Sequence, residues 1–462
     1  MMENERKFDK VVKLAKARGF VFPSSDIYGG LSSIYDYGPL GVELKNNIKK
    51  AWSDFMLARR DVVGLDSGIL MHPKIWEASG HIQGFNDPLV DCKKCKTRFR
   101  ADHLLEDLGI EPDFREGSKT DLKDVKCPEC GGELPDIRQF NLMFKTFIGP
   151  LEEDANQIYL RPETAQGIYV NFLNVKESMR LKMPFGIAQI GKAFRNEITP
   201  GNFIFRMREF EQMEMQYFVH EDQAEDIFSN WQELRKSWYE SLGMDSKNLK
   251  FREHAKDELA HYAKAAIDIE YNFAFSGENN FKELEGVHHR GIWDLSRHQE
   301  FSGQKMTVKD DDNNDYIPTV IETSIGADRA FLAFLMDAYT EIEGGRSTTT
   351  DSNKEKEVVL KLHHRLAPIK IAILPLSKKE PLANLAKEIY DNLVKNYRIQ
   401  YDETGSVGKR YRRQDEIGTP YCLTVDFESL EDNQVTVRDR DTMEQERIAI
   451  ADLPNYFKEK LN

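Results

Sequence analysis

The chain has 462 residues, of which 40% are hydrophobic and 31% charged, as is typical of a soluble globular protein with more than one domain. No stretch is long and apolar enough to span a membrane, and residues 1–10 lack the apolar core of a signal peptide, so we expect a cytoplasmic protein with no membrane partner. The formal net charge of −14 argues against non-specific nucleic-acid binding over the whole surface and restricts any polyanion to a local basic patch.

Two helices are predicted near the start of the chain. The first covers residues 8–19 and ends at a glycine. The second covers residues 41–57, and its apolar side chains recur at helical spacing as one stripe: Leu44, Ile48, Ala51, Trp52 and Phe55. Residues 62–71 are then predicted to be extended, ending at Pro73.

Residues 88–136 form a polar segment that carries two Cys-x-x-Cys pairs. Cys92 and Cys95 form the first pair, and Cys127 and Cys130 the second. In a cytoplasmic protein this spacing favours a metal over disulfides. Four thiolates suit a tetrahedral structural Zn²⁺ with no open position for catalysis, and four reduced thiols are the alternative.

Strands are predicted for much of the middle of the chain. Runs rich in β-branched and aromatic residues predict strands at 158–160, 185–194 and 208–219, and helices are expected at 221–242 and 253–266. The acidic stretch 310–315 is interpreted as a solvated turn between two strands. Residues 341–367 are expected to form a linker.

The pattern changes after Pro368 to an alternation of strands and helices. Strands are predicted at 369–374, 421–427 and 434–438, with a helix at 382–394. Such alternation is typical of a small α/β domain with a largely parallel sheet. Cys422 falls in one of these strands and is expected to be a core residue.

The arginine-rich stretch 185–218 is the first candidate for chemistry. Physically it predicts two antiparallel strands joined by a loop. Arg195 could hold a phosphate, Glu197 could accept a hydrogen bond from an exocyclic amine, and a base could stack on Phe210. A charged hairpin surface with ordinary salt bridges is the alternative.

Residues 322–329 form the second candidate. A strand that passes through a glycine-containing turn into a helix gathers backbone N–H groups and Arg329 near one point, which suits anion binding.

These stretches resemble motifs 2 and 3 of the class II aminoacyl-tRNA synthetases, and the helix and strand before Pro73 resemble motif 1. The resemblance extends in several blocks over essentially the whole chain to the glycyl-tRNA synthetases of the dimeric type, at residues 25–30, 76–80, 138–145, 161–167, 205–214, 322–329 and 408–421. It implies an α+β catalytic domain on an antiparallel sheet, formed by residues 1–87 and 137–340. It also implies a cysteine-bearing insertion at 88–136, a linker at 341–367, and an α/β anticodon-binding domain at 368–462.

The resemblance further implies which residues bind ATP and Mg²⁺. Arg195 and Arg329 would be catalytic, and Glu283 would be a magnesium ligand. The implied ATP site comprises Arg195, Asn196, Glu197, Phe205, Arg206, Met207, Arg208, Glu209, Phe210, Glu283, Leu284, Gly326, Ala327, Asp328 and Arg329.

The implied reaction forms glycyl-adenylate and then passes glycine to the 3′ end of tRNA(Gly), with release of pyrophosphate and AMP. Glutamates would hold the glycine ammonium and Arg290 its carboxylate. The implied glycine site comprises Arg100, Glu163, Phe210, Glu211, Gln212, Met213, Glu214, Arg290, Glu322, Thr323, Ser324, Ile325 and Gly326. Rejection of larger amino acids by bulk needs no editing domain.

Two kinds of partner follow from the same resemblance. The anticodon of tRNA(Gly) would contact the basic cluster Lys409, Arg410, Tyr411, Arg412 and Arg413, for which a solvated helix face is the alternative. A homodimer is expected, with the apolar stripe of the helix at 41–57 in the subunit interface. A sibling synthetase for proline, threonine or histidine, and a non-catalytic synthetase-like subunit, remain the alternative functions.

Overall fold

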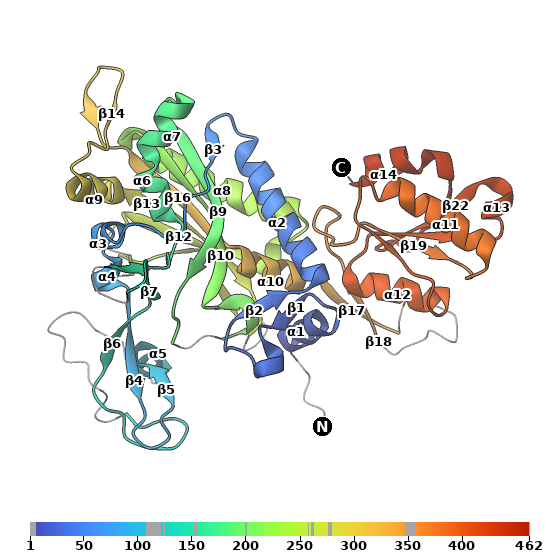
Figure 1. Cartoon of the computed structure of the whole chain (residues 1–462), viewed down its shortest axis with the longest axis horizontal. Coiled ribbons are helices and arrows are strands. Elements are labelled where there is room, and N and C mark those ends of the chain that lie inside the picture. The colour runs from blue at the N-terminus through green and yellow to red at the C-terminus, as the bar shows by residue number, and fades with distance from the viewer. Residues whose placement is uncertain are drawn as a thin grey trace.

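The computed structural model describes residues 6–107, 122, 125–151, 156–198, 201–256, 258–259, 263–275, 280–344, 346 and 356–461. Figure 1 shows a large central body, the insertion below it, and the C-terminal body to one side. Among the described residues, no helix combines the length and apolar character needed to cross a bilayer.

A seven-stranded sheet forms the centre of the large body. Its strands occur in the order β11 (Leu249–Glu253), β12 (Ala265–Asn272), β13 (Phe281–Gly291), β16 (Thr319–Gly326), β10 (Glu209–Val219), β9 (Phe185–Phe194) and β3 (Val62–Gly64). Every neighbouring pair is antiparallel except β3 and β9, which are parallel. The predicted antiparallel catalytic sheet is therefore confirmed.

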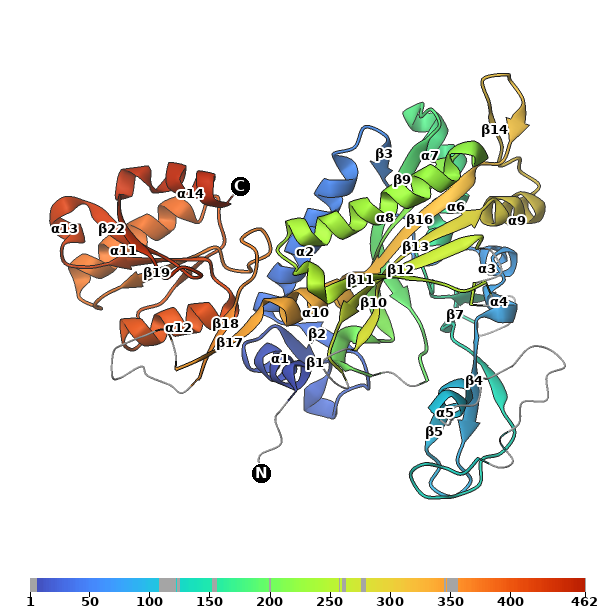
Figure 2. The same ribbon diagram turned by 180° about the vertical axis from the view of Figure 1, so that it is seen from behind.

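One face of this sheet is covered by three helices, α2 (Pro39–Leu57), α8 (Ala224–Ser241) and α10 (Ala327–Ala338). Helix α8 crosses in front of the strands in Figure 2. Their apolar side chains and those of the strands form the main core. The stripe on α2 is part of this core, with Leu44 and Ile48 fully buried and α10 packed against it. The expectation that this stripe lies in a subunit interface is wrong, because the chain itself buries it.

The other face of the sheet is covered only in part. Helices α6 (Ala165–Val170), α7 (Phe172–Met179) and α9 (Trp293–Ser302) form a second core over one end of the strands. The short helices α3 (Lys74–Ala78) and α4 (His81–Gly84) lie beyond them, and β7 (Lys145–Phe147) pairs with β8 (Gln157–Tyr159). The remaining part of this face is left open and carries the candidate site.

The predicted helix at 253–266 is wrong. Glu253 ends β11 and Ala265 begins β12, and the described residues between them are not helical. Strand β12 pairs with β11 on one side and β13 on the other, so tertiary pairing overrides the helical preference of an alanine-rich segment. The predicted turn at 310–315 does join two short strands, β14 (Val308–Lys309) and β15 (Asp315–Tyr316).

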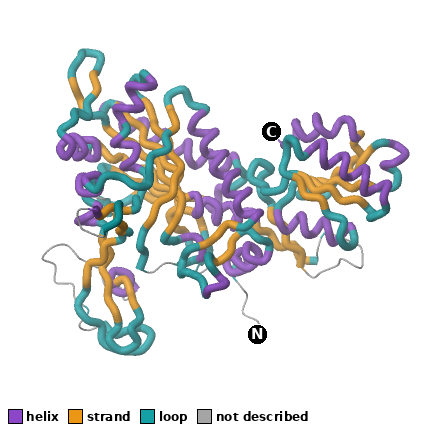
Figure 3. The backbone as a smooth tube through the Cα atoms, in the orientation of Figure 1, coloured by secondary structure: helices purple, strands orange, loops and turns teal. Residues whose placement is uncertain are grey.

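The insertion is a small unit of its own. Strands β5 (Arg98–Arg100), β4 (Asn86–Asp91) and β6 (Arg138–Asn141) form a three-stranded antiparallel sheet, and α5 (Ala101–Asp107) packs on it. The predicted start of the insertion at residue 88 therefore falls inside β4. Figure 3 shows this unit connected to the large body by extended segments.

The C-terminal part begins with a hairpin where a linker was expected. Strands β17 (Tyr339–Glu343) and β18 (Lys356–Leu360) pair antiparallel, and residues 345 and 347–355 of the predicted linker lie outside the described residues. A five-stranded sheet follows, in the order β20 (Ile399–Tyr401), β19 (Ile371–Pro375), β21 (Tyr421–Val425), β22 (Gln434–Asp439) and β23 (Gln445–Ala449).

This second sheet is mixed rather than largely parallel. Strand β19 runs parallel to β20 and β21, whereas β22 and β23 are antiparallel additions. The helices around it are α11 (Glu380–Leu393), α12 (Val407–Ile417), α13 (Ser429–Asp432) and α14 (Leu453–Leu461). Cys422 lies in its core as expected. At the other terminus, α1 (Lys7–Ala17) precedes a two-stranded sheet of β1 (Val21–Pro23) and β2 (Tyr35–Tyr37).

Candidate active site

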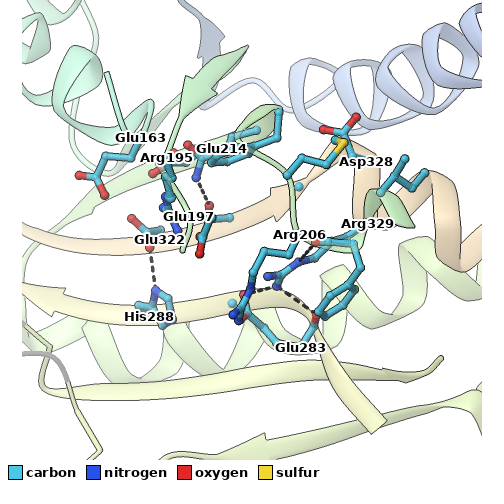
Figure 4. A pocket seen from close by; sticks show the side chains of 18 of the residues that line it. Glu163, Arg195, Glu197, Arg206, Glu214, Glu283, His288, Glu322, Asp328 and Arg329 are labelled. Atoms are coloured by element: carbon cyan, nitrogen blue, oxygen red, sulfur yellow. Dashed lines mark hydrogen bonds and ion pairs between the residues drawn. The ribbon is translucent and has the colours of Figure 1, made fainter. Parts of the chain in front are cut away.

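The open part of the large sheet holds a pocket of about 260 Å³. Strands β10, β13 and β16 form its floor, and the loop from β9 to β10 forms one wall. Figure 4 shows Arg206, Arg329 and Glu283 toward one side and Glu163, Glu214 and Glu322 toward the other, with Arg195 beside Glu214 in this view. The pocket thus brings together the two stretches that the sequence singled out, residues 185–218 and 322–329.

Strand alternation decides which predicted residues reach the pocket. Successive side chains of a strand point to opposite faces, so only every second residue of β10 and β16 can line it. The pocket is lined by Phe210, Gln212, Glu214, Glu322, Ser324 and Gly326. The alternate residues Glu211, Met213, Thr323 and Ile325 do not line it. Their assignment to glycine is therefore corrected.

Other members of the predicted ATP set also lie outside the pocket. Leu284 and Ala327 are buried in the core on the helical face of the sheet. Arg208 donates to the backbone oxygens of Ser32 and Glu197, and Glu209 forms an ion pair with Lys192. Asn196 does not line the pocket either.

The remaining members of that set meet in the pocket. They are Arg195, Glu197, Phe205, Arg206, Met207, Phe210, Glu283, Gly326, Asp328 and Arg329. Asp328 also has a structural role, because its Oδ1 accepts a hydrogen bond from Lys45 Nζ at 2.7 Å and its Oδ2 one from the backbone N–H of Glu211 at 2.8 Å.

Three arginines define the cationic end. The Arg195 guanidinium lies 5.3 Å from the ring centre of Phe210, and that of Arg329 lies 4.4 Å from the ring centre of Phe205. Burial lowers the pKa of Arg206. Arg329 is 3.1 Å from Glu283, whose pKa its charge lowers. Within the described ranges, neither Arg195 nor Arg206 forms an ion pair with a carboxylate, so neither guanidinium is neutralised by a direct partner.

Glu197 lies beside these arginines with an unused acceptor. Its side chain is buried, and the Oε2 atom has no hydrogen-bond partner among the described residues. A buried carboxylate oxygen without a donor is costly unless a ligand supplies one. The position favours a ligand with an N–H or O–H group.

Three carboxylates define the acidic end, of which Glu214 and Glu322 are buried and Glu163 is half-buried. Glu163 accepts from Gln166 Nε2 at 2.8 Å, and its other oxygen is 3.5 Å from His81 Nε2. Glu214 accepts from the Thr164 hydroxyl. Glu322 accepts from His288 Nδ1 at 2.7 Å.

The three carboxyls differ in charge state. Burial, together with the charges of Glu322 and Glu163, raises the pKa of Glu214 well above its usual range. Burial acts in the same direction on Glu322, but Arg290 and His288 lower its pKa to about 2. His81 and Arg290 likewise hold the pKa of Glu163 below its usual range against the effect of burial. The end is therefore anionic, and Glu214 holds a proton more readily than the other two.

Arg290 and Arg100, which were predicted to bind glycine, lie in different parts of the molecule. Arg290 lines the pocket, but two of its nitrogens donate to Asp294 at 2.9 and 3.0 Å and a third donates to Glu322 at 3.0 Å. Arg100 does not line the pocket. It belongs to the insertion, where it pairs with Asp87 and Asp102.

The sequence reasoning missed several pocket residues. His288 and Gly286 lie on β13 at the same parity as the predicted Arg290, and Ile204 lies in the wall. Counting back in steps of two from Arg290 would have found the first two. Two further groups, His81 and the buried Gln216, touch the carboxylates. Gln216 lies two residues after Glu214 on β10, so the same counting would have found it, whereas no sequence signal marks His81.

The four paired cysteines meet at one point of the insertion. Their sulfur atoms all lie within 4.8 Å of one another, with 3.5 Å between those of Cys92 and Cys130. Sulfurs about 2.3 Å from a common Zn²⁺ would be about 3.8 Å apart. A Cβ at Gly132 would come within 2.9 Å of the Cys92 sulfur, so a glycine there leaves room for the cluster. The donor set fits a tetrahedral zinc site.

The basic cluster near the C-terminus lies on α12. Arg410 is buried, with Nη1 donating to the backbone oxygens of Pro375 and Asp402, and the Tyr411 ring is covered by Arg438. Arg413 pairs with Asp402. Arg410 and Tyr411 therefore hold the domain together rather than face a partner, which corrects their assignment to the anticodon. Lys409 is exposed and Arg412 half-buried.

Comparison with known proteins agrees with this architecture. Residues 144–339 match the family model "tRNA synthetase class II core domain (G, H, P, S and T)", and residues 370–460 match "Anticodon binding domain". The first match covers the pocket and every strand of the seven-stranded sheet except β3, and the second covers the mixed C-terminal sheet. The fold and the site thus define a class II aminoacyl-tRNA synthetase.

Relatives that match over their full length show which family within this class the chain belongs to. The glycine–tRNA ligase of Alkaliphilus oremlandii is 53% identical over 473 residues, covering 100% of both chains. Those of Geobacillus kaustophilus and Treponema denticola are 55% and 53% identical, each covering 98% or more of both chains. The chain belongs to the glycine–tRNA ligase family.

Proposed function

We propose that the chain activates glycine with ATP, releasing pyrophosphate, and transfers glycine from glycyl-adenylate to the 3′ end of tRNA(Gly), releasing AMP. The pocket carries this proposal, because it joins an arginine-rich end to an end with three carboxylates. The first end suits a nucleoside triphosphate and the second a small ammonium. The names of the full-length relatives support the same activity.

The cationic end is proposed as the ATP site. Adenine would stack on Phe210 and donate its amino group to Glu197, whose Oε2 otherwise lacks a donor. Arg329 would cover the other face of the base and reach the γ-phosphate. Glu283 would provide a carboxylate for Mg²⁺, which when bound supplies charge neutralisation at the phosphates.

Arg195 is proposed to stabilise the transition state. A glycine carboxylate oxygen attacks the α-phosphorus, the bond to pyrophosphate breaks, and negative charge grows on the equatorial oxygens. The Arg195 Nε donates to Pro162 O at 3.0 Å, which fixes the side chain while its Nη atoms stay available. Catalysis then comes from positioning and charge, with no protein nucleophile.

The acidic end is proposed as the glycine site. Glu163, Glu214 and Glu322 would surround the ammonium, with Ser324 beside them. A bound cation lowers the cost of bringing these carboxylates together. Arg290 would reach the glycine carboxylate with the guanidinium already fixed by Asp294. Asp102 and Asp87 raise the pKa of Arg100 against the effect of burial. Because Arg100 does not line the pocket, we propose it only as a glycine contact from outside the pocket.

We propose that Lys409 and Arg412, together with Arg413, contact the tRNA anticodon. Neither Lys409 nor Arg412 forms an ion pair with another described residue, so both can pair with phosphates. Replacing both by alanine should raise the KM for tRNA about 10-fold and reduce its salt dependence, while pyrophosphate exchange is unchanged. An unchanged KM for tRNA would reject this contact.

The cysteine cluster is proposed to hold a structural zinc ion that stabilises the insertion. Purified protein should contain one zinc per chain by metal analysis, and Cys130→Ser should lose it. Cys422→Ser, in the other domain, serves as the control and should retain the metal. Zinc-free wild-type protein with an ordered insertion would contradict the proposal.

A cytoplasmic homodimer is also proposed. Since α2 buries its stripe internally, support now comes from exposed apolar side chains near the N-terminus, Ile27 and Tyr28 at 88% exposure and Leu31 at 60%. Light scattering at micromolar concentration should give twice the chain mass of 53.5 kDa. A monomer would reject the dimer.

The activity is tested by ATP–pyrophosphate exchange with glycine, proline, threonine and histidine. Exchange with glycine alone is expected, because the carboxylates leave space for a small ammonium and little else. Exchange with another of the four would indicate a sibling synthetase. Lack of exchange with all four would indicate a non-catalytic subunit.

A further inference from the structure

A buried carboxamide lies between two of the three pocket carboxylates. The Nε2 atom of Gln216 donates to Glu214 Oε1 at 2.7 Å and to Glu322 Oε2 at 2.6 Å. A primary amide nitrogen carries two hydrogens, so each carboxylate receives one. The Gln216 side chain is completely buried and does not line the pocket.

Tyr169 fixes the orientation of this amide. Its hydroxyl donates to Gln216 Oε1 at 2.7 Å from α6, beneath the sheet. The reverse orientation would aim the amide oxygen at two carboxylates, which repel it. Tyr169 is itself fully buried among the side chains of α6 and its neighbours. Every polar atom of the carboxamide therefore has a defined partner.

The register of the sheet explains why a neutral donor is needed here. Gln216 on β10 is the direct partner of Glu322 on β16, and Glu214 is two residues away on the same face. Side chains at such positions are neighbours. Two adjacent buried carboxylates would otherwise move apart or share a proton.

No other group connects the two carboxylates in the part of the chain that the structure describes. The Thr164 hydroxyl donates to Glu214, whereas His288 and Arg290 donate to Glu322. Gln216 therefore links the two acids through one nitrogen, and the Tyr169 hydroxyl sets the orientation of its amide.

We propose that Gln216, oriented by Tyr169, is a positioning residue for glycine, which holds Glu214 and Glu322 at the separation that the glycine ammonium bridges. The proposal rests on the proposed assignment of these carboxylates to the ammonium. Neither Gln216 nor Tyr169 touches the amino acid. Both act through the two carboxylates, whose remaining lone pairs are left for the ligand.

Gln216→Met and Tyr169→Phe test this in pyrophosphate exchange. Methionine has similar length and no donors, and phenylalanine lacks only the hydroxyl. We expect the KM for glycine to rise about 30-fold and about 5-fold, respectively, since a lost hydrogen bond to a charged group has effects of this order. The KM for ATP should stay within about 2-fold of wild type, because the cationic end is untouched. Tyr271→Phe, which removes a buried hydroxyl 3.3 Å from Asp337 outside the pocket, should change neither constant.

The double variant separates positioning from packing. If Tyr169 acts through Gln216, adding Tyr169→Phe to Gln216→Met should raise the KM for glycine no further. Independent, multiplicative effects would overturn the proposed relay. If Gln216→Met does not fold, Tyr169→Phe alone decides, and an unchanged KM for glycine overturns the proposal.

The Glu322→Gln variant distinguishes failure of the positioning role from failure of the proposed glycine site. If Glu322→Gln raises the KM for glycine while Gln216→Met and Tyr169→Phe do not, only the positioning role fails. If Glu322→Gln also leaves the KM for glycine unchanged, the assignment of the acidic end itself fails.

Discussion

The two ends of the pocket lie over the same sheet but are held in opposite ways. At the acidic end, Glu163, Glu214 and Glu322 each accept hydrogen bonds from the chain itself. At the cationic end, Arg195 and Arg206 form no ion pair with a described carboxylate, and Glu197 Oε2 accepts no hydrogen bond from a described residue. One end is fixed in advance by the protein, and the other leaves its strongest interactions for the ligand.

This difference matches the size and charge of the proposed ligands. Glycine has few atoms and one ammonium, so recognition depends on carboxylates already in place. A triphosphate carries enough charge to compensate arginines that the protein leaves unpaired. Substitutions at the cationic end should therefore affect chemistry and ATP, and those at the acidic end the KM for glycine.

The largest effect is expected at Arg195. Arg195→Ala should lower the rate of pyrophosphate exchange about 1,000-fold, because it removes a fixed charge from the transition state. Lys192→Ala, which removes an exposed cation on β9 three residues before Arg195, is the control and should stay within about 3-fold. Near-normal exchange by Arg195→Ala would break the proposed division between the two ends.

The next largest effect is expected at the acidic end. Glu322→Gln keeps the shape of the side chain and removes its charge, so the KM for glycine should rise about 100-fold, with the KM for ATP little changed. Glu341→Gln, which removes a carboxylate paired with Lys10 far from the pocket, should leave both constants unchanged. A parallel rise of both KM values would show that the ends are coupled.

A smaller effect is expected at the unused acceptor. Glu197→Leu should raise the KM for ATP about 10-fold, because the adenine amino group loses its partner. Glu197→Gln retains an acceptor oxygen and should stay within about 3-fold. Comparison of ATP with a purine triphosphate that lacks the amino group provides the readout: wild type should discriminate, and Glu197→Leu should not.

The smallest effect concerns pH. Although burial opposes it, Glu322 raises the pKa of His288 above its ordinary value. The stabilisation from this pair is therefore fully present below the unfolded pKa of about 6.5 and is lost as the pH rises through the higher folded pKa. The difference in unfolding free energy between wild type and His288→Asn should shrink by up to about 1 kcal/mol from pH 6 to 8. Chemical denaturation measures it, and a constant difference would contradict the ion pair.

The sequence predicted the strands of the site more accurately than its individual residues. The 185–194 strand has the predicted bounds, because its β-branched and aromatic run ends where the arginine-rich loop begins. Glu211, Met213, Thr323 and Ile325 were misassigned, since a contiguous motif spans both faces of a strand.

Other contacts were inaccessible to sequence reasoning for a different reason. The contact of Gln216 with Glu322 joins residues 106 positions apart, and that of His288 with Glu322 joins residues 34 apart. Both depend on strand register, which one sequence does not reveal. The burial of Arg410 likewise depends on two carbonyl groups that only the folded domain brings to it.

The alternation of side chains along β10 also determines how this strand tolerates changes in length. Deleting one residue of β10 would shift the following residues by one position. For a deletion just before Met213, Met213 and Met215 would turn toward the ligand, and Glu214 and Gln216 would turn toward the apolar core. Such a deletion would remove ligand recognition and destabilise the fold in one step. Insertions and deletions in this strand should therefore be excluded far more strictly than most of its single substitutions.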